Sequence, residues 1–235
     1  MPNLSSRCLH RELLDTGEVP DRETFRSLSD MRRINRIFGG RRLLLEGVAS
    51  AVARSGLRRF SVLDIASGSC DLPLAILDWA ERHGFDARVF ALEYRHRHLT
   101  LFHSELSLHP RLLLICGDAL HPPLPDRSFD FITCCNFLHH LAESEAQQLL
   151  ALMKRLARQA FIISDLERHW FPYSFFRLTS RWFTDTAVSR VDGATSIGQA
   201  FQKAEMEQTA RGAGIREFVV NRRWPFRLLM VARAA

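Results

Sequence analysis

One short stretch, residues 60–73 (FSVLDIASGSCDLP), constrains the fold of this 235-residue chain more than any other. An apolar run ends at the carboxylate of Asp64, small residues occupy positions 66–70, and a helix-like segment then runs from Leu72 to His83. This order is typical of a buried parallel strand that turns tightly into the N-terminus of a helix. Small residues in such a turn allow a ligand to approach the backbone N–H groups. The stretch therefore predicts an α/β fold with a ligand site at the end of this strand.

The residue types in this turn exclude two common nucleotide-binding motifs, the Gly-Lys-Ser/Thr of a P-loop and the dinucleotide G-x-G-x-x-G. Asp64 would repel a pyrophosphate but attract a cationic ligand. The stretch resembles the first motif of the class I S-adenosylmethionine (SAM) dependent methyltransferases, Asp/Glu-x-Gly-x-Gly-x-Gly; an ordinary α/β turn is the alternative. Ala66 and Cys70 replace two of the three glycines and only Gly68 remains. The loop tolerates these replacements if neither position needs a positive φ.

Carboxylates at the ends of two later apolar runs are candidate cofactor ligands. Glu93 ends the predicted strand 88–93, 25 residues after Gly68, near the spacing at which an acidic residue meets a ribose diol in βαβ folds. The resemblance implies that Asp118, after the next strand, accepts from the adenine amino group and that Asp64 orients the loop and the methionine ammonium. A surface glutamate and an ordinary Gly-Asp turn are the alternatives. The full set predicted to bind SAM, and its product S-adenosylhomocysteine, is Asp64, Ala66, Gly68, Glu93, Tyr94, Asp118, Ala119, Asn136 and Arg41.

Two adjacent histidines follow the predicted fourth strand, residues 131–135. The ligand site of an open α/β sheet lies beyond the carboxyl ends of its strands, which puts Asn136, His139 and His140 beside a bound cofactor. The segment 136–141 resembles the Leu-His-His-Leu that follows the fourth strand in the same family.

A histidine that titrates near neutrality can take the proton of a phenol, whose own pKa is near 10. We expect His139 to act as this base, with His140 as the alternative. A third possibility is that the histidine only orients the substrate while Asp165, near the end of the predicted strand 160–166, accepts the proton. The predicted catalytic residues are therefore His139, His140 and Asp165.

The N-terminal segment, residues 1–41, is predicted to form polar helices that end at Gly39-Gly40. Residues 31–40 resemble the N-terminal segment of small bacterial methyltransferases from polyketide and phenolic pathways, where it covers cofactor and substrate as a lid. Simple packing on the core, residues 42–235, is the alternative. The lid interpretation predicts that one arginine among Arg33, Arg36 and Arg41 reaches the carboxylate of the cofactor.

A predicted insertion at about residues 168–198 follows the fifth strand and is rich in aromatic side chains. Because it follows the carboxyl end of a strand, these side chains are expected to line a pocket for a planar, apolar substrate; a core beneath the insertion is the alternative. The candidate substrate-binding residues are Arg168, Tyr173, Arg190 and Asp192.

The remaining periodicity predicts helices at 42–56, 96–108, 143–157 and 199–213, and two final strands at 215–221 and 226–233. With the resemblance, this order predicts a Rossmann-like, doubly wound, seven-stranded and mostly parallel sheet, preceded by a helical lid and carrying a helical insertion after the fifth strand.

Charge and cysteine usage limit the partners. The formal net charge is 32 − 26 = +6, nearly all from arginine, without a block of five or six like charges, so no nucleic-acid partner is expected. The five cysteines show no zinc spacing and are expected to be reduced and buried. Neither a signal sequence nor a membrane-length apolar run is evident, which predicts a cytoplasmic protein. No metal is expected: Asp165 and Asp192 could be ligands but fit a metal-free enzyme equally well.

Together these features predict a SAM-dependent methyltransferase that methylates a hydroxyl on a small aromatic or polyketide-derived metabolite, in natural-product biosynthesis. N- or C-methylation of a similar molecule is one alternative. A catalytically silent SAM-fold binding subunit is another, indicated by Ala66 and Cys70. The partner expected is a small molecule, and the oligomeric state stays open.

Overall fold

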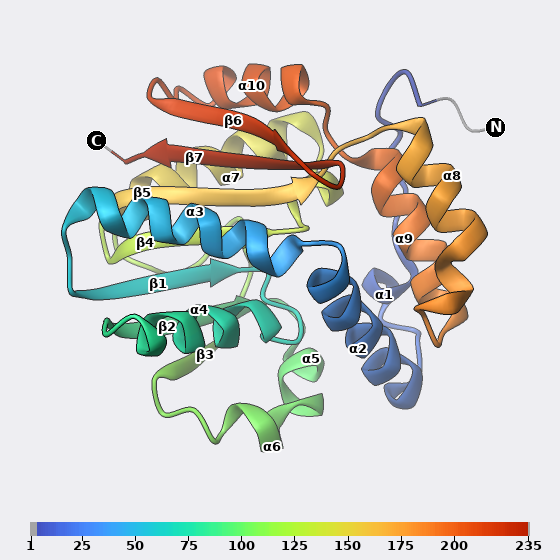
Figure 1. The fold of residues 1–235 in the computed structure, drawn as a ribbon, viewed down its shortest axis with the longest axis horizontal. Coiled ribbons are helices and arrows are strands. Elements are labelled where there is room, and N and C mark those ends of the chain that lie inside the picture. Colours follow the sequence, from blue (N-terminus) through green and yellow to red (C-terminus); the bar gives the residue numbers. More distant parts are fainter. Residues whose placement is uncertain (1–3, 235) are drawn as a thin grey trace.

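Seven strands form one sheet in the order β3-β2-β1-β4-β5-β7-β6 (Figure 1). The computed structural model describes residues 4–234. Neighbouring strands are parallel except at β7, which is antiparallel to both β5 and β6. This order confirms the predicted doubly wound, mostly parallel, Rossmann-like sheet. The strands are β1 (Arg59–Ile65), β2 (Asp86–Glu93), β3 (Leu112–Cys116), β4 (Phe129–Cys135), β5 (Ala157–Leu166), β6 (Phe218–Arg223) and β7 (Arg227–Arg233).

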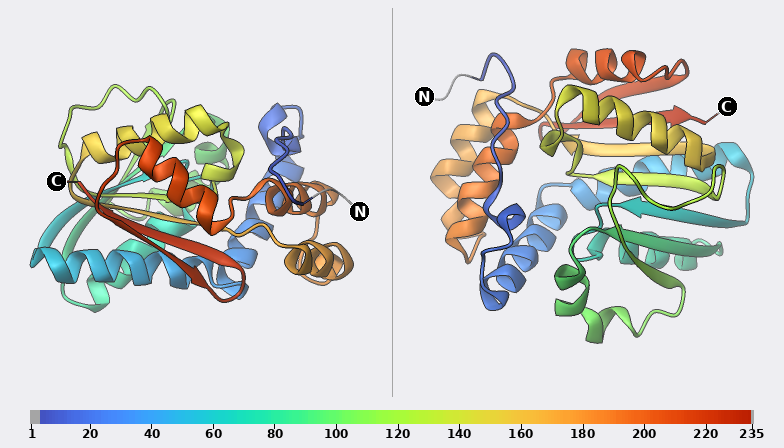
Figure 2. Two further views of the ribbon diagram at one scale, coloured as in Figure 1. Left: turned by 90° about the horizontal axis from the view of Figure 1, so that it is seen from above. Right: turned by 180° about the vertical axis from the view of Figure 1, so that it is seen from behind.

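Helices cover both faces of the sheet, so its central strands are apolar on both sides (Figure 2). In β1, Val62 packs into the core on one face, whereas Leu63 and Ile65 pack into the core on the other. Side chains of the first face meet α3 (Gly40–Ser55), α4 (Asp71–Arg82), α5 (His96–Leu101) and α6 (His103–Leu106). Those of the second face meet α7 (Glu143–Leu156) and α10 (Lys203–Gly212).

The other helices gather beyond the carboxyl ends of the parallel strands, where they form a separate layer (Figures 1 and 2). They are α1 (Leu13–Thr16), α2 (Asp21–Ile37), α8 (Trp170–Thr179), the short η2 (Ser180–Trp182) and α9 (Ala187–Gln199). α9 contacts α1, α2 and α8, so the N-terminal segment and the insertion after β5 pack together. Both segments therefore lie on the side of the sheet where a ligand site is expected.

Several predicted boundaries differ from the structure. Residues 4–12 form no helix, and the predicted helix 96–108 breaks at Phe102 into α5 and α6. The predicted helix 199–213 begins only at Lys203, because α9 runs to Gln199 and the chain is then extended at Ala200. The division into a lid (1–41) and a core (42–235) stays a prediction, and residues 1–3 of that lid lie outside the described residues.

The cysteine prediction is partly wrong. All five cysteines are free, but Cys8 and Cys116 are exposed, and only Cys70, Cys134 and Cys135 are buried. Cys116 is the last residue of β3, an edge strand, which explains its exposure. Across residues 4–234 no helix has the length and apolar character needed to cross a bilayer.

Candidate active site

The turn after β1 adopts backbone conformations that favour glycine. Ala66 has a φ of 58°, Gly68 of 53° and Cys70 of 60°. The expectation that the two replaced positions avoid a positive φ is therefore wrong. For residues with a Cβ this region costs about 1–2 kcal/mol each. The positive φ values at these three alternate positions bend the chain tightly, and α4 begins at Asp71 directly after the last of them.

We predict that Ala66→Gly raises the free energy of unfolding by up to about 1 kcal/mol, because relief of the strain exceeds the entropic cost of a glycine. The control is Ala91→Gly in the extended, buried middle of β2, which should destabilise the fold. Urea denaturation of both variants measures the difference. A destabilised Ala66→Gly variant would show that the turn carries no strain of this size.

Two buried carboxylates lie at the first two strand ends. Asp64 accepts a hydrogen bond from the Oγ1 of Thr133 at 2.6 Å. Burial raises the pKa of Asp64 to about 7. Glu93 accepts hydrogen bonds from the backbone N–H of Gly68 at 2.8 Å and of Arg95 at 2.9 Å. Glu93 therefore holds the turn after β1 against the end of β2.

Asp64 gives a pH-dependent prediction. The pKa of Asp64 in the folded protein lies above the ordinary value of 3.8, so the folded protein binds this proton more tightly than the unfolded chain does. The contribution of Asp64 to the free energy of unfolding therefore falls as the pH rises from about 4 to 7. The stability of Asp64→Asn relative to wild type should therefore grow by about 2–3 kcal/mol between pH 5 and pH 8. Urea denaturation at both pH values tests this, with the exposed Asp78→Asn as the control. A difference that does not grow with pH would contradict the account.

The other residues predicted to bind the cofactor lie at the same edge of the sheet. Tyr94 follows β2 and is 68% exposed, while Ala119, after β3, is buried. Asp118 accepts from the backbone N–H of Leu120 and pairs with His121, both at 2.9 Å, and the imidazole of His121 lowers the pKa of Asp118. These positions are compatible with contacts to a nucleoside.

An arginine that was not among the three predicted contacts the turn after β1. Arg32, on α2, donates to the backbone oxygen of Ser69 and pairs with Glu105 at 2.6 Å. Among the predicted arginines, Arg33 pairs with Asp185, Arg41 pairs with Asp78, and Arg36 lines the large cavity described below. The helical period of α2 predicted an arginine-rich segment, but not which arginine faces the turn.

A cavity of about 660 Å³ lies between the layer of helices and the carboxyl ends of the strands. Its wall is mostly apolar, with aromatic side chains from three segments: Phe38, Phe171, Phe175, Phe176, Trp224 and Phe226. Asn35 and Asn136 line it on the side of the turn. Asn136 donates to the Oδ1 of Asn35 at 2.9 Å, and Asn35 donates to Asp71 at 3.3 Å. This chain of amides connects the cavity with the start of α4.

His139 is held rigidly at the wall of this cavity. It lies in the short helix η1 (Leu138–His140) and is 1% exposed. Its Nδ1 lies 2.6 Å from Asp165, which also accepts from its backbone N–H at 3.2 Å. Burial alone would lower the pKa of His139, but the carboxylates of Asp165 and Glu12 outweigh it and raise the pKa to about 10. β4 and β5 are neighbours, which brings the predicted catalytic His139 and Asp165 together.

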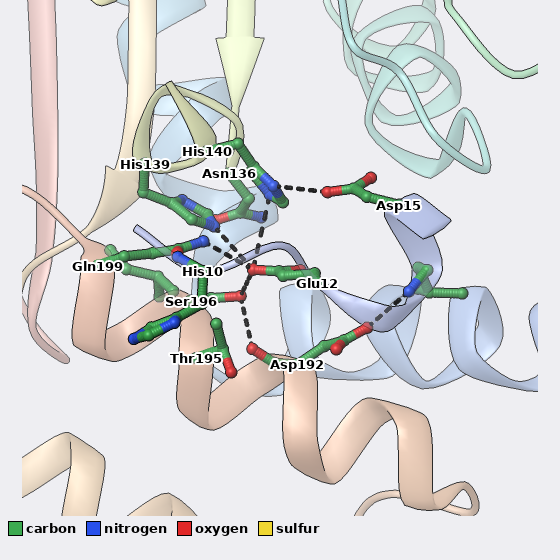
Figure 3. Close-up of polar contacts among 12 residues, drawn as sticks. His10, Glu12, Asp15, Asn136, His139, His140, Asp192, Thr195, Ser196 and Gln199 are labelled. Atoms are coloured by element: carbon green, nitrogen blue, oxygen red, sulfur yellow. Dashed lines mark hydrogen bonds and ion pairs between the residues drawn. The ribbon is translucent and has the colours of Figure 1, made fainter. Parts of the chain in front are cut away.

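His140 lies against His139, with a ring-to-ring distance of 4.4 Å, and also lines the cavity. Its Nδ1 lies 3.0 Å from the carboxylate of Asp15. The Nε2 atoms of His139 and His140 lie 3.7 Å and 3.8 Å from one oxygen of Glu12 (Figure 3). The three side chains bring one ligand atom each to within 4.8 Å of one another, a spacing that could hold a metal ion. We call Glu12, His139 and His140 the histidine cluster.

Glu12 was not predicted from the sequence. It comes from the N-terminal segment, which crosses the site and docks on α9 (Figure 3). Asp192 accepts from the backbone N–H of Leu13 at 2.7 Å and of Leu14 at 3.0 Å. Burial raises the pKa of Asp192 to about 6. The oxygen of Glu12 that faces the histidines also accepts from the Oγ of Ser196 at 2.5 Å.

The four predicted substrate residues lie in three different places. Asp192 lines the large cavity. Tyr173 and Arg190 line a second cavity of about 590 Å³. Arg168 is buried and lines neither cavity, because its guanidinium pairs with Glu205 at 2.6 Å and donates to backbone oxygens.

The chain is similar to known methyltransferases. Residues 62–160 match the family model of a methyltransferase domain. A SAM-dependent methyltransferase from Aquifex aeolicus is 18% identical, with a TM-score of 0.57 over 80% of this chain and 89% of that one. Human N-acetylserotonin methyltransferase in complex with SAM is 13% identical, with a TM-score of 0.65 over 95% and 62% of the two chains. Magnesium protoporphyrin IX methyltransferase from Synechocystis with bound S-adenosylhomocysteine is 16% identical, with a TM-score of 0.57 over 84% of each.

No curated protein matches the chain in sequence. Because the identities are only 13–18%, the solved structures establish similarity of fold alone. The family model matches the central strands and helices in sequence. Both agree with the resemblance at residues 60–73. Residues 62–160 are therefore similar to a methyltransferase domain, and the chain has the fold of the class I SAM-dependent methyltransferases, whose cofactor is SAM.

Proposed function

We propose that the chain transfers the methyl group of SAM to the hydroxyl of a small, planar and apolar acceptor bound in the large cavity. The cofactor is proposed to bind at the turn after β1, with its ribose on Glu93, its adenine near Asp118 and its methionine part near Asp64. Asn136 belongs to both sites, because it follows β4 and lines the cavity. Arg41 is also proposed to contact the carboxylate of the cofactor. In the structure Arg41 pairs with the exposed Asp78.

The observation that carries this proposal is the composition of the cavity. Its wall is mostly apolar and includes six aromatic side chains, which favour a flat, apolar molecule. One polar part of the wall is formed by the histidine cluster and Asn136, which lie close together (Figure 3), and Arg36, Arg42 and Arg227 line the cavity as well. An acceptor whose ring occupies the apolar part is proposed to direct its hydroxyl toward the histidine cluster. One solved structure of similar fold, an O-methyltransferase family 2 protein from Planctomyces limnophilus, is a complex with apigenin, a ligand of this general kind.

The histidine cluster is the place where the hydroxyl is proposed to lose its proton. A methyl transfer of this type is an in-line displacement, and alignment of oxygen, methyl carbon and sulfur accounts for much of the catalysis. Asp165 binds the Nδ1 of His139, so the Nε2 on the other side of the ring faces Glu12. His140 is 21% exposed in its side chain and is the more accessible of the two rings from the cavity. We therefore assign the direct contact with the acceptor to His140 and a positioning role to Asp165.

The test is methyl transfer from isotopically labelled SAM to a panel of phenols and polyketide-like hydroxyls, followed by nuclear magnetic resonance of the product. The proposal expects the label on an oxygen. A label on nitrogen or carbon would support the alternative acceptor chemistry. SAM binding without turnover on any acceptor would favour a silent binding subunit.

A further inference from the structure

We propose that the histidine cluster, Glu12, His139 and His140, binds one divalent transition-metal cation of the Zn²⁺ type at the wall of the large cavity. Nothing in the sequence predicts this set, because Glu12 lies far from the two histidines along the chain. The folded chain brings the three ligand atoms to within 4.8 Å of one another.

Both histidine rings are oriented as in metal sites. A histidine that binds a metal through one nitrogen almost always gives its other N–H to a carboxylate or carbonyl, which fixes the ring. Here the Nδ1 of His139 contacts Asp165 at 2.6 Å, and the Nδ1 of His140 contacts Asp15 at 3.0 Å. Two separate carboxylates therefore direct both Nε2 atoms toward Glu12 (Figure 3).

The distances between the ligand atoms suit a cation better than hydrogen bonds. The separations of 3.7 Å and 3.8 Å from the two Nε2 atoms to Glu12 are too long for hydrogen bonds. In a tetrahedral zinc site with bonds of about 2.0–2.1 Å, neighbouring ligand atoms lie about 3.3–3.5 Å apart. The Nε2 of His139 is also buried without a hydrogen-bond partner within the described residues. A cation between these atoms would satisfy it after small shifts of the side chains.

Hydrogen bonds from α9 also hold the carboxylate of Glu12 in place. Its cluster-facing oxygen accepts from the Oγ of Ser196 at 2.5 Å and from the Nε2 of Gln199 at 3.2 Å, both on α9. Hydrogen bonds of this kind orient ligating carboxylates. Two histidines and one glutamate are a ligand set of catalytic zinc sites, in which the fourth position is open.

The role of the cation, unlike its binding, rests on the proposed function. All three ligands line the cavity, so the open position would face the acceptor. A hydroxyl bound there would lose its proton to solvent more readily, because the cation stabilises the oxyanion. With the cation in place, His140 would act on the acceptor as a ligand of that cation, and not through the direct contact assigned to it in the metal-free chain. Because Glu12 belongs to the N-terminal segment, the cation would also join this segment to the core.

The experiment titrates Co²⁺, a spectroscopic substitute for Zn²⁺, into the metal-free full chain without SAM or acceptor. Visible absorption and elemental analysis after gel filtration should give one ion per chain, bound at micromolar concentrations. Glu12→Gln and His140→Ala should weaken binding at least tenfold, whereas His83→Ala, at an exposed site on the C-terminal side of α4, should not. Circular dichroism checks that each variant is folded, and if one variant is unfolded, the other decides.

Equal affinity in wild type and both cluster variants, or no ion retained by wild type, would overturn the proposal and leave an imidazole–carboxylate cluster. Calorimetry of SAM on the metal-free chain is the separate test of the cofactor site. Its failure would reject the proposed function without affecting the cation result, and loss of Co²⁺ binding would leave SAM binding intact.

Discussion

Replacement of His140 by glutamine is expected to lower kcat for methyl transfer by about 10²–10⁴, the range typical for loss of a group that handles a proton. The side chain lines the cavity beside Glu12 and His139, where the acceptor hydroxyl is proposed to lie. The affinity for SAM should stay unchanged, because within the described residues His140 forms hydrogen bonds and ion pairs with Phe137, Glu12 and Asp15, none of which is assigned to the cofactor. Steady-state kinetics and calorimetry on the same preparation separate the two effects.

The matched control for this variant is His83→Gln, which changes a histidine outside the site and should keep full activity. His139→Gln is less informative, because His139 is buried and its loss removes the imidazole that pairs with the buried carboxylate of Asp165. Unchanged kcat in His140→Gln would remove this residue from the reaction. Equal losses of kcat and SAM affinity would indicate a structural role instead.

Glu93→Ala is expected to weaken SAM binding at least tenfold. Loss of a buried hydrogen bond with charged character costs about 1.5–3 kcal/mol, and about 1.4 kcal/mol corresponds to a factor of ten. Glu93 also accepts from the backbone N–H of Gly68, so its loss loosens the turn after β1. Calorimetric titration with SAM measures the effect, with Glu81→Ala, an exposed residue on α4, as the control.

The variant Glu93→Gln separates the two contributions of this residue. Its amide oxygen can still accept one backbone hydrogen bond, but one of the two carboxylate oxygens is lost. We expect an affinity between those of wild type and Glu93→Ala. SAM affinity equal to wild type in both variants would exclude Glu93 from the cofactor site.

Much of the sheet could be predicted from the sequence, because its strands are apolar runs buried on both faces. The strand ends Asp64, Glu93 and Asp118 fall at one edge because parallel strands place their carboxyl ends together. The same rule brought His139 near Asp165, since β4 and β5 are neighbours. Local pattern and topology were sufficient for these features.

The remainder depends on contacts between distant segments, which no local pattern encodes. No periodic pattern in the sequence predicts the position of Glu12. Glu12 reaches the histidines because Asp192 binds the backbone of Leu13 and Leu14 and because side chains of α9 bind its carboxylate. Arg168 follows a strand end, as a substrate ligand would. Its side chain is nevertheless buried, because it pairs with Glu205 on α10. The positive φ of Ala66 is a property of the turn geometry and is not evident from the residue type.

The account is tested most directly by a crystal structure of the chain with S-adenosylhomocysteine and an acceptor that proves to be a substrate. The account predicts the ribose on Glu93, the sulfur facing the cavity beside Asn136, and the acceptor oxygen between that sulfur and the histidine cluster. A cofactor bound away from the turn after β1, or an acceptor oxygen directed away from Glu12 and His140, would contradict it.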